Sequence, residues 1–248
     1  MTFVIAHRGA SADAPENTLA AFRLAFEQGA DGIEGDFRLS SDGRIVCLHD
    51  DDLARVAGSQ RVVRETTFAD LQQFDIGRWK GKRWRGERIV SLEEVLEVVP
   101  AGKWLVMELK AGPEIVAPLA DVLDQATIAR QQVLVISLVD ATFAECKRRL
   151  PALPCHWLSG YAQRADGDWS PNAEEVVVKI RQLGANGFGS ESRPECFNAA
   201  FVQRLRSAGI SEFHVWTVDD PEAARLYASL GAWGITTNRP ALIRSAMR

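Results

Sequence analysis

Paired cysteines and long apolar runs are both missing from this sequence, and their absence excludes several protein classes. The four cysteines are widely spaced and form no C-x-x-C pair, which argues against a zinc ribbon or a disulfide framework. No stretch approaches the roughly 18 apolar residues of a membrane-spanning helix, and the first residues do not resemble an export signal. We therefore expect reduced thiols in a cytoplasmic protein without a stable membrane anchor.

An excess of charge of one sign is also missing. The net charge is −4 over 248 residues, which argues against a general affinity for nucleic acid. The hydrophobic fraction of 46%, with only 10 Pro and 19 Gly, is typical of an ordinary globular protein. We expect a single domain over residues 1–248, since α/β barrels of this length commonly form one domain. The sequence assigns no oligomeric state.

Short β-branched runs alternate with helical patterns along nearly the whole chain, which indicates βα units around a parallel sheet. This rhythm, at this length, predicts an α/β fold of the TIM (β/α)8 barrel type. An open doubly wound sheet is the alternative, but no G-x-G-x-x-G follows the first strand. The predicted strands span residues 3–6, 32–37, 104–109, 133–137, 155–158, 187–189, 213–218 and 234–237.

One segment after the second strand interrupts the rhythm. A turn signal at Ser40-Ser41-Asp42-Gly43 precedes an alternating run over residues 44–49, which predicts an inserted hairpin. Residues 50–88 then form a long connection with a small helical segment at residues 71–74, and connections of that length are usually functional. Its basic, aromatic stretch Trp79–Arg85 is interpreted as a solvated loop, with a phosphate or lipid contact as the alternative.

Three carboxylates belong to strands that end on the same face of the predicted barrel. Glu34 and Asp36 are two apart, so they share one side of their strand, and Glu108 lies in the next barrel strand. Converging carboxylates repel one another unless a cation joins them. Oxygen ligands favour one divalent cation of the hard type, Mg²⁺ or Ca²⁺. The alternative is an ion network of these groups with Arg8 or Lys110.

Two histidines are expected on the same face. His7 ends the first strand and His49 ends the hairpin, and imidazoles titrate near neutral pH, so a pair of them can serve as acid and base. Arg8 and Lys110 supply positive charge that can clamp a phosphate. Trp216 lines either the substrate pocket or the core. The two other histidines, His156 and His214, lie within strands and are interpreted as structural.

Carboxylates, a cation, two histidines and an arginine together indicate metal-assisted phosphoryl chemistry. At this point the sequence resembles the glycerophosphodiester phosphodiesterase family, in family order over essentially the whole chain. The matching segments are His7-Arg8-Gly9, Pro15-Glu16-Asn17-Thr18, Gly29-Ala30-Asp31, Ile33-Glu34-x-Asp36, Ser41-Asp42-Gly43, His49-Asp50, Glu108-Leu109-Lys110 and Trp216-Thr217-Val218.

The resemblance implies a TIM barrel with an inserted region at about residues 50–88. It makes His7 and His49 the acid and base and Arg8 and Lys110 the phosphate binders. The metal ligands it implies are Glu34, Asp36 and Glu108. One departure from the family pattern is Asn238, which stands where an aspartate is usual.

The function expected from this resemblance is metal-dependent hydrolysis of glycerophosphodiesters to sn-glycerol 3-phosphate and an alcohol. One alternative is a related barrel phospholipase, of the lysophospholipase D or cyclising type, which would require an apolar entrance for lipid. A catalytically silent barrel that only binds phosphodiesters is another, but every catalytic position is filled.

Overall fold

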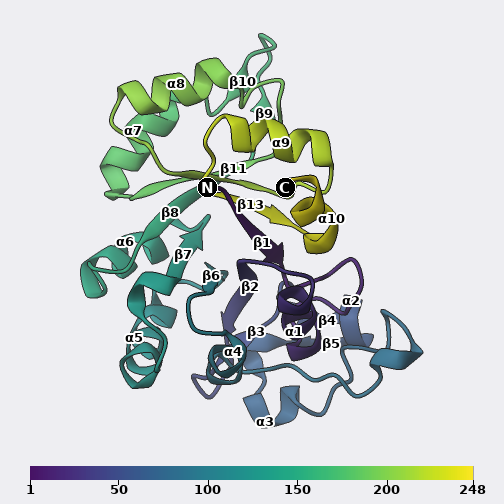
Figure 1. The fold of residues 1–248 in the computed structure, drawn as a ribbon. Helices are drawn as coiled ribbons and strands as arrows, with labels where there is room; N and C mark the ends of the chain where they lie inside the picture. Colours follow the sequence, from purple (N-terminus) through teal and green to yellow (C-terminus); the bar gives the residue numbers. More distant parts are fainter. Residues whose placement is uncertain (248) are drawn as a thin grey trace.

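A computed structural model describes residues 1–247, and in that range eight parallel strands close into a barrel (Figure 1). The sheet closes because β1 pairs in parallel with β2 on one side and with β13 on the other. The TIM-barrel prediction is confirmed, although the strand predicted over 213–218 ends at Trp216. The barrel strands are β1 (Phe3–His7), β2 (Gly32–Leu39), β6 (Trp104–Leu109), β7 (Val133–Ser137), β8 (Cys155–Ser159), β11 (Gly187–Glu191), β12 (Phe213–Trp216) and β13 (Gly234–Thr237).

Helices surround the barrel and cover the outer face of its strands (Figure 1). Ser91 and Glu94 form the capping box that starts α4, with each side chain bonded to the other residue's backbone. The surrounding helices are α1 (Leu19–Glu27), α4 (Leu92–Val98), α5 (Val116–Gln125), α6 (Asp140–Arg149), α7 (Ala173–Leu183), α8 (Ala199–Ser207), α9 (Pro221–Ser229) and α10 (Pro240–Ala246). The part of the chain that the structure describes contains no helix long and apolar enough to cross a membrane.

The inside of the barrel is packed with alternate residues of its strands. An apolar cluster that includes Ile5, Val106 and Leu134 fills the middle. His156 and His214 are both buried, with their Nδ1 atoms 3.0 Å apart and their rings stacked. Glycines of β11 make room for them, since a Cβ at position 189 would lie 2.4 Å from the His214 ring. Both histidines are thus buried within the barrel, in agreement with their structural interpretation.

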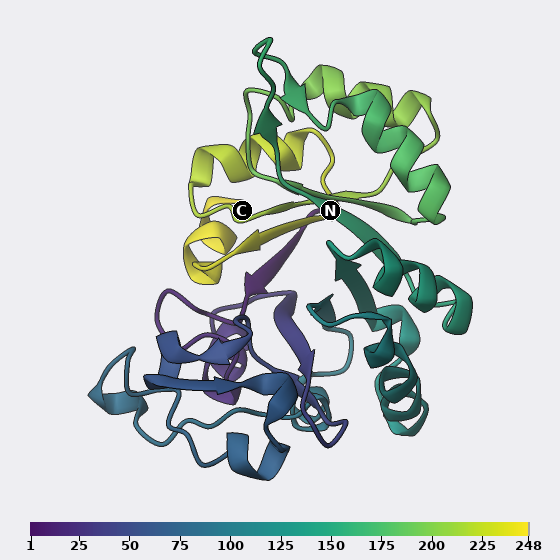
Figure 2. The same ribbon diagram turned by 180° about the vertical axis from the view of Figure 1, so that it is seen from behind.

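The inserted hairpin is confirmed, because β3 (Ile45–Cys47) pairs antiparallel with β2. The connection after it contains β4 (Asp52–Leu53), α2 (Ala54–Ala57), β5 (Ser59–Val62) and α3 (Phe68–Leu71). The helix α3 begins three residues before the predicted position, since the Thr67 side chain accepts a hydrogen bond from the Asp70 backbone N–H and caps it there. A small apolar core of its own, which includes Val56, Val63 and Leu71, holds this inserted segment together beside the barrel (Figure 2).

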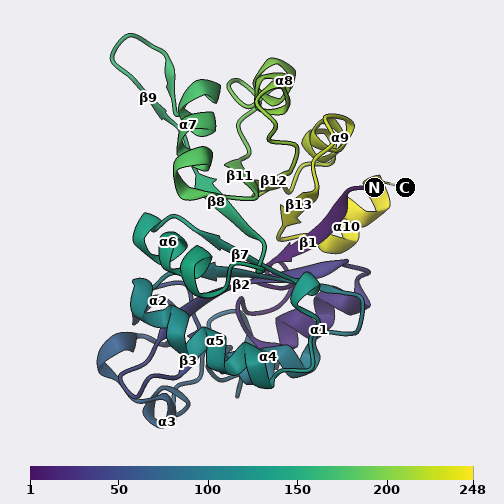
Figure 3. The same ribbon diagram turned by 90° about the vertical axis from the view of Figure 1, so that its left-hand side faces the viewer.

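A second small hairpin, which the sequence analysis did not predict, joins β8 to α7. Its strands are β9 (Ala162–Gln163) and β10 (Trp169–Ser170), paired antiparallel. Figure 3 shows this hairpin and the inserted segment on the same side of the barrel, the side toward which the arrow of β1 points. In TIM barrels the active site lies on this carboxyl-terminal face.

Candidate active site

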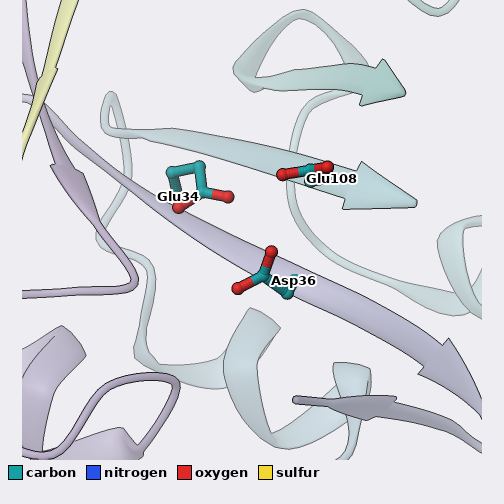
Figure 4. Close-up of side chains that lie close together, drawn as sticks. All are labelled: Glu34, Asp36 and Glu108. Carbon is teal, nitrogen blue, oxygen red and sulfur yellow. The ribbon is translucent and has the colours of Figure 1, made fainter. Parts of the chain in front are cut away.

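The three predicted carboxylates meet at the carboxyl ends of β2 and β6. Asp36 and Glu108 are direct register partners on these neighbouring strands, and Glu34 lies two residues before Asp36. Each offers one oxygen, and the three oxygens lie within 4.8 Å of one another. Figure 4 shows the side chains of the two strands gathered around a common space. The structure therefore brings together the residues that the sequence predicts as cation ligands.

The charges of this cluster are only partly compensated by the protein. Burial, followed by the charges of Asp36 and Glu108, raises the pKa of Glu34 well above its ordinary value. Burial and then Asp36 also raise the pKa of Glu108, although Lys110 opposes them. For Asp36, burial acts in the same direction but is outweighed by Arg8 and Lys110, so its pKa lies below the ordinary value.

Two carboxylate oxygens of the cluster lack hydrogen-bond partners among the described residues. Glu34 Oε1 and Asp36 Oδ1 are buried and have no hydrogen-bond partner within residues 1–247, and the Lys110 ammonium stands 3.3 Å from the latter. Buried carboxylate oxygens without partners are costly, and a cation removes that cost. An all-oxygen donor set suits a hard divalent ion. The residues present therefore fit a divalent cation.

Arg8 is held at the mouth by three acidic side chains. Its backbone N–H donates to Glu34 Oε2 at 2.9 Å, its Nε lies 3.1 Å from Asp36 Oδ2, and its Nη1 donates to Glu16 at 2.9 Å. Arg8 has a left-handed φ of 55°, which is uncommon for a residue with a side chain. Gly9 follows with φ 81°, and a Cβ there would lie 2.6 Å from the Ala21 backbone. The His-Arg-Gly turn therefore requires its glycine.

Lys110 lies on the other side of the cluster, directly after β6. Its ammonium is 2.6 Å from Glu108 Oε1 and 3.3 Å from Asp36 Oδ1. The pKa of Lys110 is raised, because the lowering effect of burial is exceeded by the attraction of these carboxylates. Its side chain keeps 16% exposure and that of Arg8 keeps 18%, so both cations can be reached from the mouth.

Each of the two histidines has a defined partner on its Nδ1 atom. His7 Nδ1 lies 2.8 Å from Asn238 Oδ1, and His49 Nδ1 lies 2.7 Å from Asp50 Oδ1. Burial, followed by the charge of Arg8, lowers the pKa of His7. Asp36 acts electrostatically on His7, and His49 acts on Asp36. Each imidazole is therefore near enough to Asp36 to interact with it electrostatically.

Trp216 ends β12 and is packed, half-buried, against the apolar interior of the barrel. Its indole Nε1 is buried and finds no acceptor among the described residues. The register places it opposite Glu191 of β11. A role in substrate binding stays a prediction.

A cavity of about 670 Å³ adjoins the site on the side of Lys110. It extends between the inserted segment and the connection that follows β6. Asp51 and Arg38, two of its lining residues, are joined to each other by an ion pair, and Arg38 also donates to the His49 carbonyl at 2.6 and 3.0 Å. The lining is Arg38, Leu39, Ser40, Ser41, Asp51, Val62, Val63, Arg64, Lys110, Ala111, Gly112 and Glu114.

Several supporting residues received no role in the sequence analysis. Asn17 donates through Nδ2 to Asp36 Oδ2 at 2.8 Å and has a left-handed φ of 57°. Arg55 of α2 bonds both Glu16 and Asp50, at 2.6–3.0 Å, and so links the partner of Arg8 to that of His49. Glu16 and Asn17 belong to the motif Pro15-Glu16-Asn17-Thr18, and that motif was the sequence signal by which their supporting roles could have been predicted.

Comparison with known proteins agrees with this geometry. The model of the glycerophosphoryl diester phosphodiesterase family matches residues 7–242. A glycerophosphodiester phosphodiesterase of Caldanaerobacter subterraneus subsp. tengcongensis is 31% identical over 252 residues, which cover 100% of this chain and 98% of the relative.

Solved structures of similar fold lead to the same family. A phosphodiesterase of Oleispira antarctica, in complex with the product sn-glycerol-3-phosphate, has a TM-score of 0.87 and 29% identity, covering 100% of this chain and 97% of that one. A glycerophosphodiester phosphodiesterase of Thermotoga maritima has a TM-score of 0.79 and 26% identity, covering 100% and 99%. This chain therefore belongs to the glycerophosphoryl diester phosphodiesterase family of enzymes.

Proposed function

We propose that this chain hydrolyses glycerophosphodiesters to sn-glycerol 3-phosphate and a free alcohol with the help of one divalent cation. The observation that carries the proposal is the carboxylate cluster of Glu34, Asp36 and Glu108, which is paired with Arg8 and Lys110. His7 and His49 both interact electrostatically with its central member, Asp36. The similar Oleispira antarctica phosphodiesterase, which holds sn-glycerol-3-phosphate as its product, supports the same product here.

The cation ligands in this proposal are Glu34, Asp36 and Glu108, and the ion is Mg²⁺ or Ca²⁺. When bound, such an ion supplies a Lewis acid that neutralises charge on phosphate oxygens. Arg8 and Lys110 stand beside the cluster and bind the remaining phosphate oxygens, Arg8 as a planar donor and Lys110 as a point charge.

His7 and His49 perform the proton transfers. One imidazole takes the proton from the attacking hydroxyl as the hydroxyl oxygen bonds to phosphorus. The other gives a proton to the leaving alkoxide as the P–O bond to the alcohol breaks. The attacking hydroxyl is the glycerol 2-hydroxyl, which gives a cyclic phosphate that water then opens with the two roles reversed. Each positioned acid or base typically contributes about 10²- to 10⁴-fold in rate.

We propose that the cavity beside Lys110 receives the leaving alcohol. Lys110, the proposed phosphate binder, forms part of the lining, so in this proposal one ester arm of the bound phosphate extends into the cavity. Arg38 is already paired with Asp51, whereas Arg64 is 81% exposed and meets its chain neighbour Glu65 only at 3.4 Å. A polar alcohol that carries an anionic or hydroxyl group therefore suits Arg64.

The lipid-substrate alternative depends on the basic stretch Trp79–Arg85. Two side chains of that stretch bind the inserted segment to the loop after β1. Lys80 Nζ donates to the Ser11 carbonyl at 2.6 Å, and Arg83 donates to the Asp13 carbonyl at 2.9 Å. Trp79 keeps 42% exposure. Lysophospholipid is accordingly the comparison substrate in the test.

A cytoplasmic location completes the proposal. The cysteines at positions 47, 146, 155 and 196 are free thiols in the described structure, and the first three are buried. Reduced thiols are the usual state in the cytosol.

The decisive experiment measures release of glycerol 3-phosphate from glycerophosphodiesters by protein stripped with EDTA, with Mg²⁺ and Ca²⁺ added back separately. We expect release to return with one of these ions and to stay absent in a Glu34→Ala variant. Release of the head-group alcohol from lysophospholipid, with no glycerol 3-phosphate from any glycerophosphodiester, would replace this proposal by the phospholipase alternative.

A further inference from the structure

The side-chain amide of Asn238 lies between His7 and Asp219. Its Oδ1 is 2.8 Å from His7 Nδ1, and its Nδ2 donates to Asp219 Oδ2 at 2.7 Å. The backbone N–H of Asn238 and the hydroxyl of Thr237 both donate to Asp219 Oδ1 at 2.8 Å. The residue after β13 and the loop after β12 thus converge behind the histidine.

Asp219 decides which way the Asn238 amide points. A carboxylate only accepts hydrogen bonds, so the amide nitrogen must face Asp219 and the amide oxygen must face His7. The Ser11 hydroxyl also lies 2.8 Å from Asn238 Oδ1 and 2.7 Å from the His7 carbonyl. That hydroxyl can donate to either oxygen, so it does not override the carboxylate.

The amide orientation in turn decides where the proton of His7 resides. Asn238 Oδ1 only accepts, so the partner atom, His7 Nδ1, must carry a proton. In the neutral imidazole the other nitrogen, Nε2, then holds the lone pair. Asp219, which does not bond His7, therefore sets its tautomer through Asn238.

We propose that Asn238 and Asp219 are positioning residues that hold His7 as its Nδ1–H tautomer and so make His7 Nε2 the proton acceptor of the reaction. In the first step Nε2 takes the proton of the attacking hydroxyl while the new O–P bond forms. His49, whose Nδ1 faces the carboxylate of Asp50, donates its proton to the alkoxide that leaves. Only the catalytic role of Nε2 rests on the proposed function, whereas the tautomer does not.

An Asp219→Asn substitution distinguishes this arrangement from simple packing. The Thr237 hydroxyl and the Asn238 backbone N–H, which donate to Asp219 Oδ1, hold the amide oxygen of the new side chain in the same place. The NH₂ group of the new side chain therefore points toward the NH₂ group of Asn238. Two donors cannot face each other, so the Asn238 amide flips and presents NH₂ to His7. His7 Nδ1 must then accept, and the proton moves to Nε2.

The tautomer is read by NMR of protein labelled with ¹⁵N-histidine, with the His7 signals assigned by their loss in a His7→Gln variant. We expect a proton on Nδ1 in the natural protein and on Nε2 in Asp219→Asn. A double variant, Asn238→Asp with Asp219→Asn, exchanges acid and amide and restores the Nδ1 proton. A proton on Nε2 in the natural protein, or an unchanged tautomer in Asp219→Asn, would overturn the proposal.

Kinetics provide the second readout. In a serine protease triad, the corresponding acid-to-amide change lowers kcat about 10⁴-fold through the wrong tautomer. We expect Asp219→Asn to lower kcat by roughly 10²- to 10⁴-fold with little change in KM, and the double variant to recover most of it. No recovery, or an effect on KM alone, would contradict the positioning role.

The adjacent Asp220→Asn variant is the matched control. Asp220 caps α9 by accepting from the Ala223 backbone N–H, which asparagine does equally well. We expect neither the His7 tautomer nor kcat to change in this variant. If the natural protein hydrolyses no glycerophosphodiester, the proposed function fails while the NMR result still decides the tautomer.

Discussion

Asp36 and Glu108 lie directly opposite each other on the parallel strands β2 and β6. Glu34, two residues before Asp36, lies on the same side of β2. Register brings their carboxylates together, and the burial of Glu34 and Asp36 keeps water from screening those two charges. Within residues 1–247, Arg8 and Lys110 are the cationic side chains that form ion pairs with the cluster. The cluster therefore carries electrostatic repulsion that a divalent cation would relieve, and the first prediction tests that repulsion.

A divalent cation should stabilise the natural protein against unfolding. At about 100 times its Kd, a bound ion adds about 2.7 kcal/mol to the free energy of unfolding, seen as a rise in Tm. A Glu34→Gln variant should lose this gain, yet in EDTA it should be at least as stable as the natural protein, because a buried charge and its repulsion are removed. Calorimetry with and without cation measures both effects. The exposed Glu97→Gln variant serves as control, and a normal cation response in Glu34→Gln would refute the assigned ligand.

Replacement of His49 by alanine should abolish most turnover but leave cation binding intact. His49 has its hydrogen bond to Asp50 outside the carboxylate cluster, so its removal spares the ligands. We expect kcat to fall by roughly 10²- to 10⁴-fold, while the cation-dependent rise in Tm stays as large as in the natural protein. Near-normal turnover would remove His49 from the mechanism.

The stability of the barrel should depend on pH through its buried histidine pair. Burial lowers the pKa of His156, and burial followed by the charge of His156 lowers that of His214 well below 6.5. Below pH 6.5 these two histidines therefore bind protons in the unfolded chain but stay neutral in the folded barrel. The contribution of the histidine pair to the free energy of unfolding is fully present above pH 6.5. It is lost as the pH falls toward the lowered pKa values, by at most about 1.4 kcal/mol per pH unit for each histidine.

Urea unfolding at a series of pH values checks this dependence. The comparison is with the double variant His156→Leu/His214→Leu, in which the pair cannot titrate. The difference in unfolding free energy between the two proteins should change in favour of the natural protein as the pH rises through this range. A difference that is independent of pH would show that the pair does not resist protonation.

The proposed cavity for the leaving alcohol predicts a change of substrate preference. An Arg64→Glu variant should lower kcat/KM for glycerophosphoserine relative to glycerophosphocholine by roughly two- to fivefold. The effect is small because exposed ion pairs contribute only about 0.2–1 kcal/mol. The exposed Arg61→Glu variant, in the same inserted segment but outside the lining, has the same change of charge. Equal ratios in the two variants would exclude Arg64 from head-group recognition.

Local patterns in the sequence were sufficient to predict much of this fold. A strand shows itself through apolar, β-branched residues within a few positions, so all eight barrel strands could be located. The Ser91–Glu94 capping box spans only four residues and could be predicted equally well. Because parallel barrel strands carry their functional side chains at one end, strand ends alone also led to Glu34, Asp36 and Glu108.

Contacts between distant segments were decided by the tertiary structure alone. The bond between His7 and Asn238 joins residues 231 positions apart, and Arg55 joins Glu16 across 39 positions. No periodicity records such pairs, because their geometry arises only when the barrel closes. The sequence by itself thus determined the elements and the reactive groups. Tertiary packing determined the direction of their pKa shifts, their partners and the cavity beside them, since burial and long-range hydrogen bonds exist only in the folded chain.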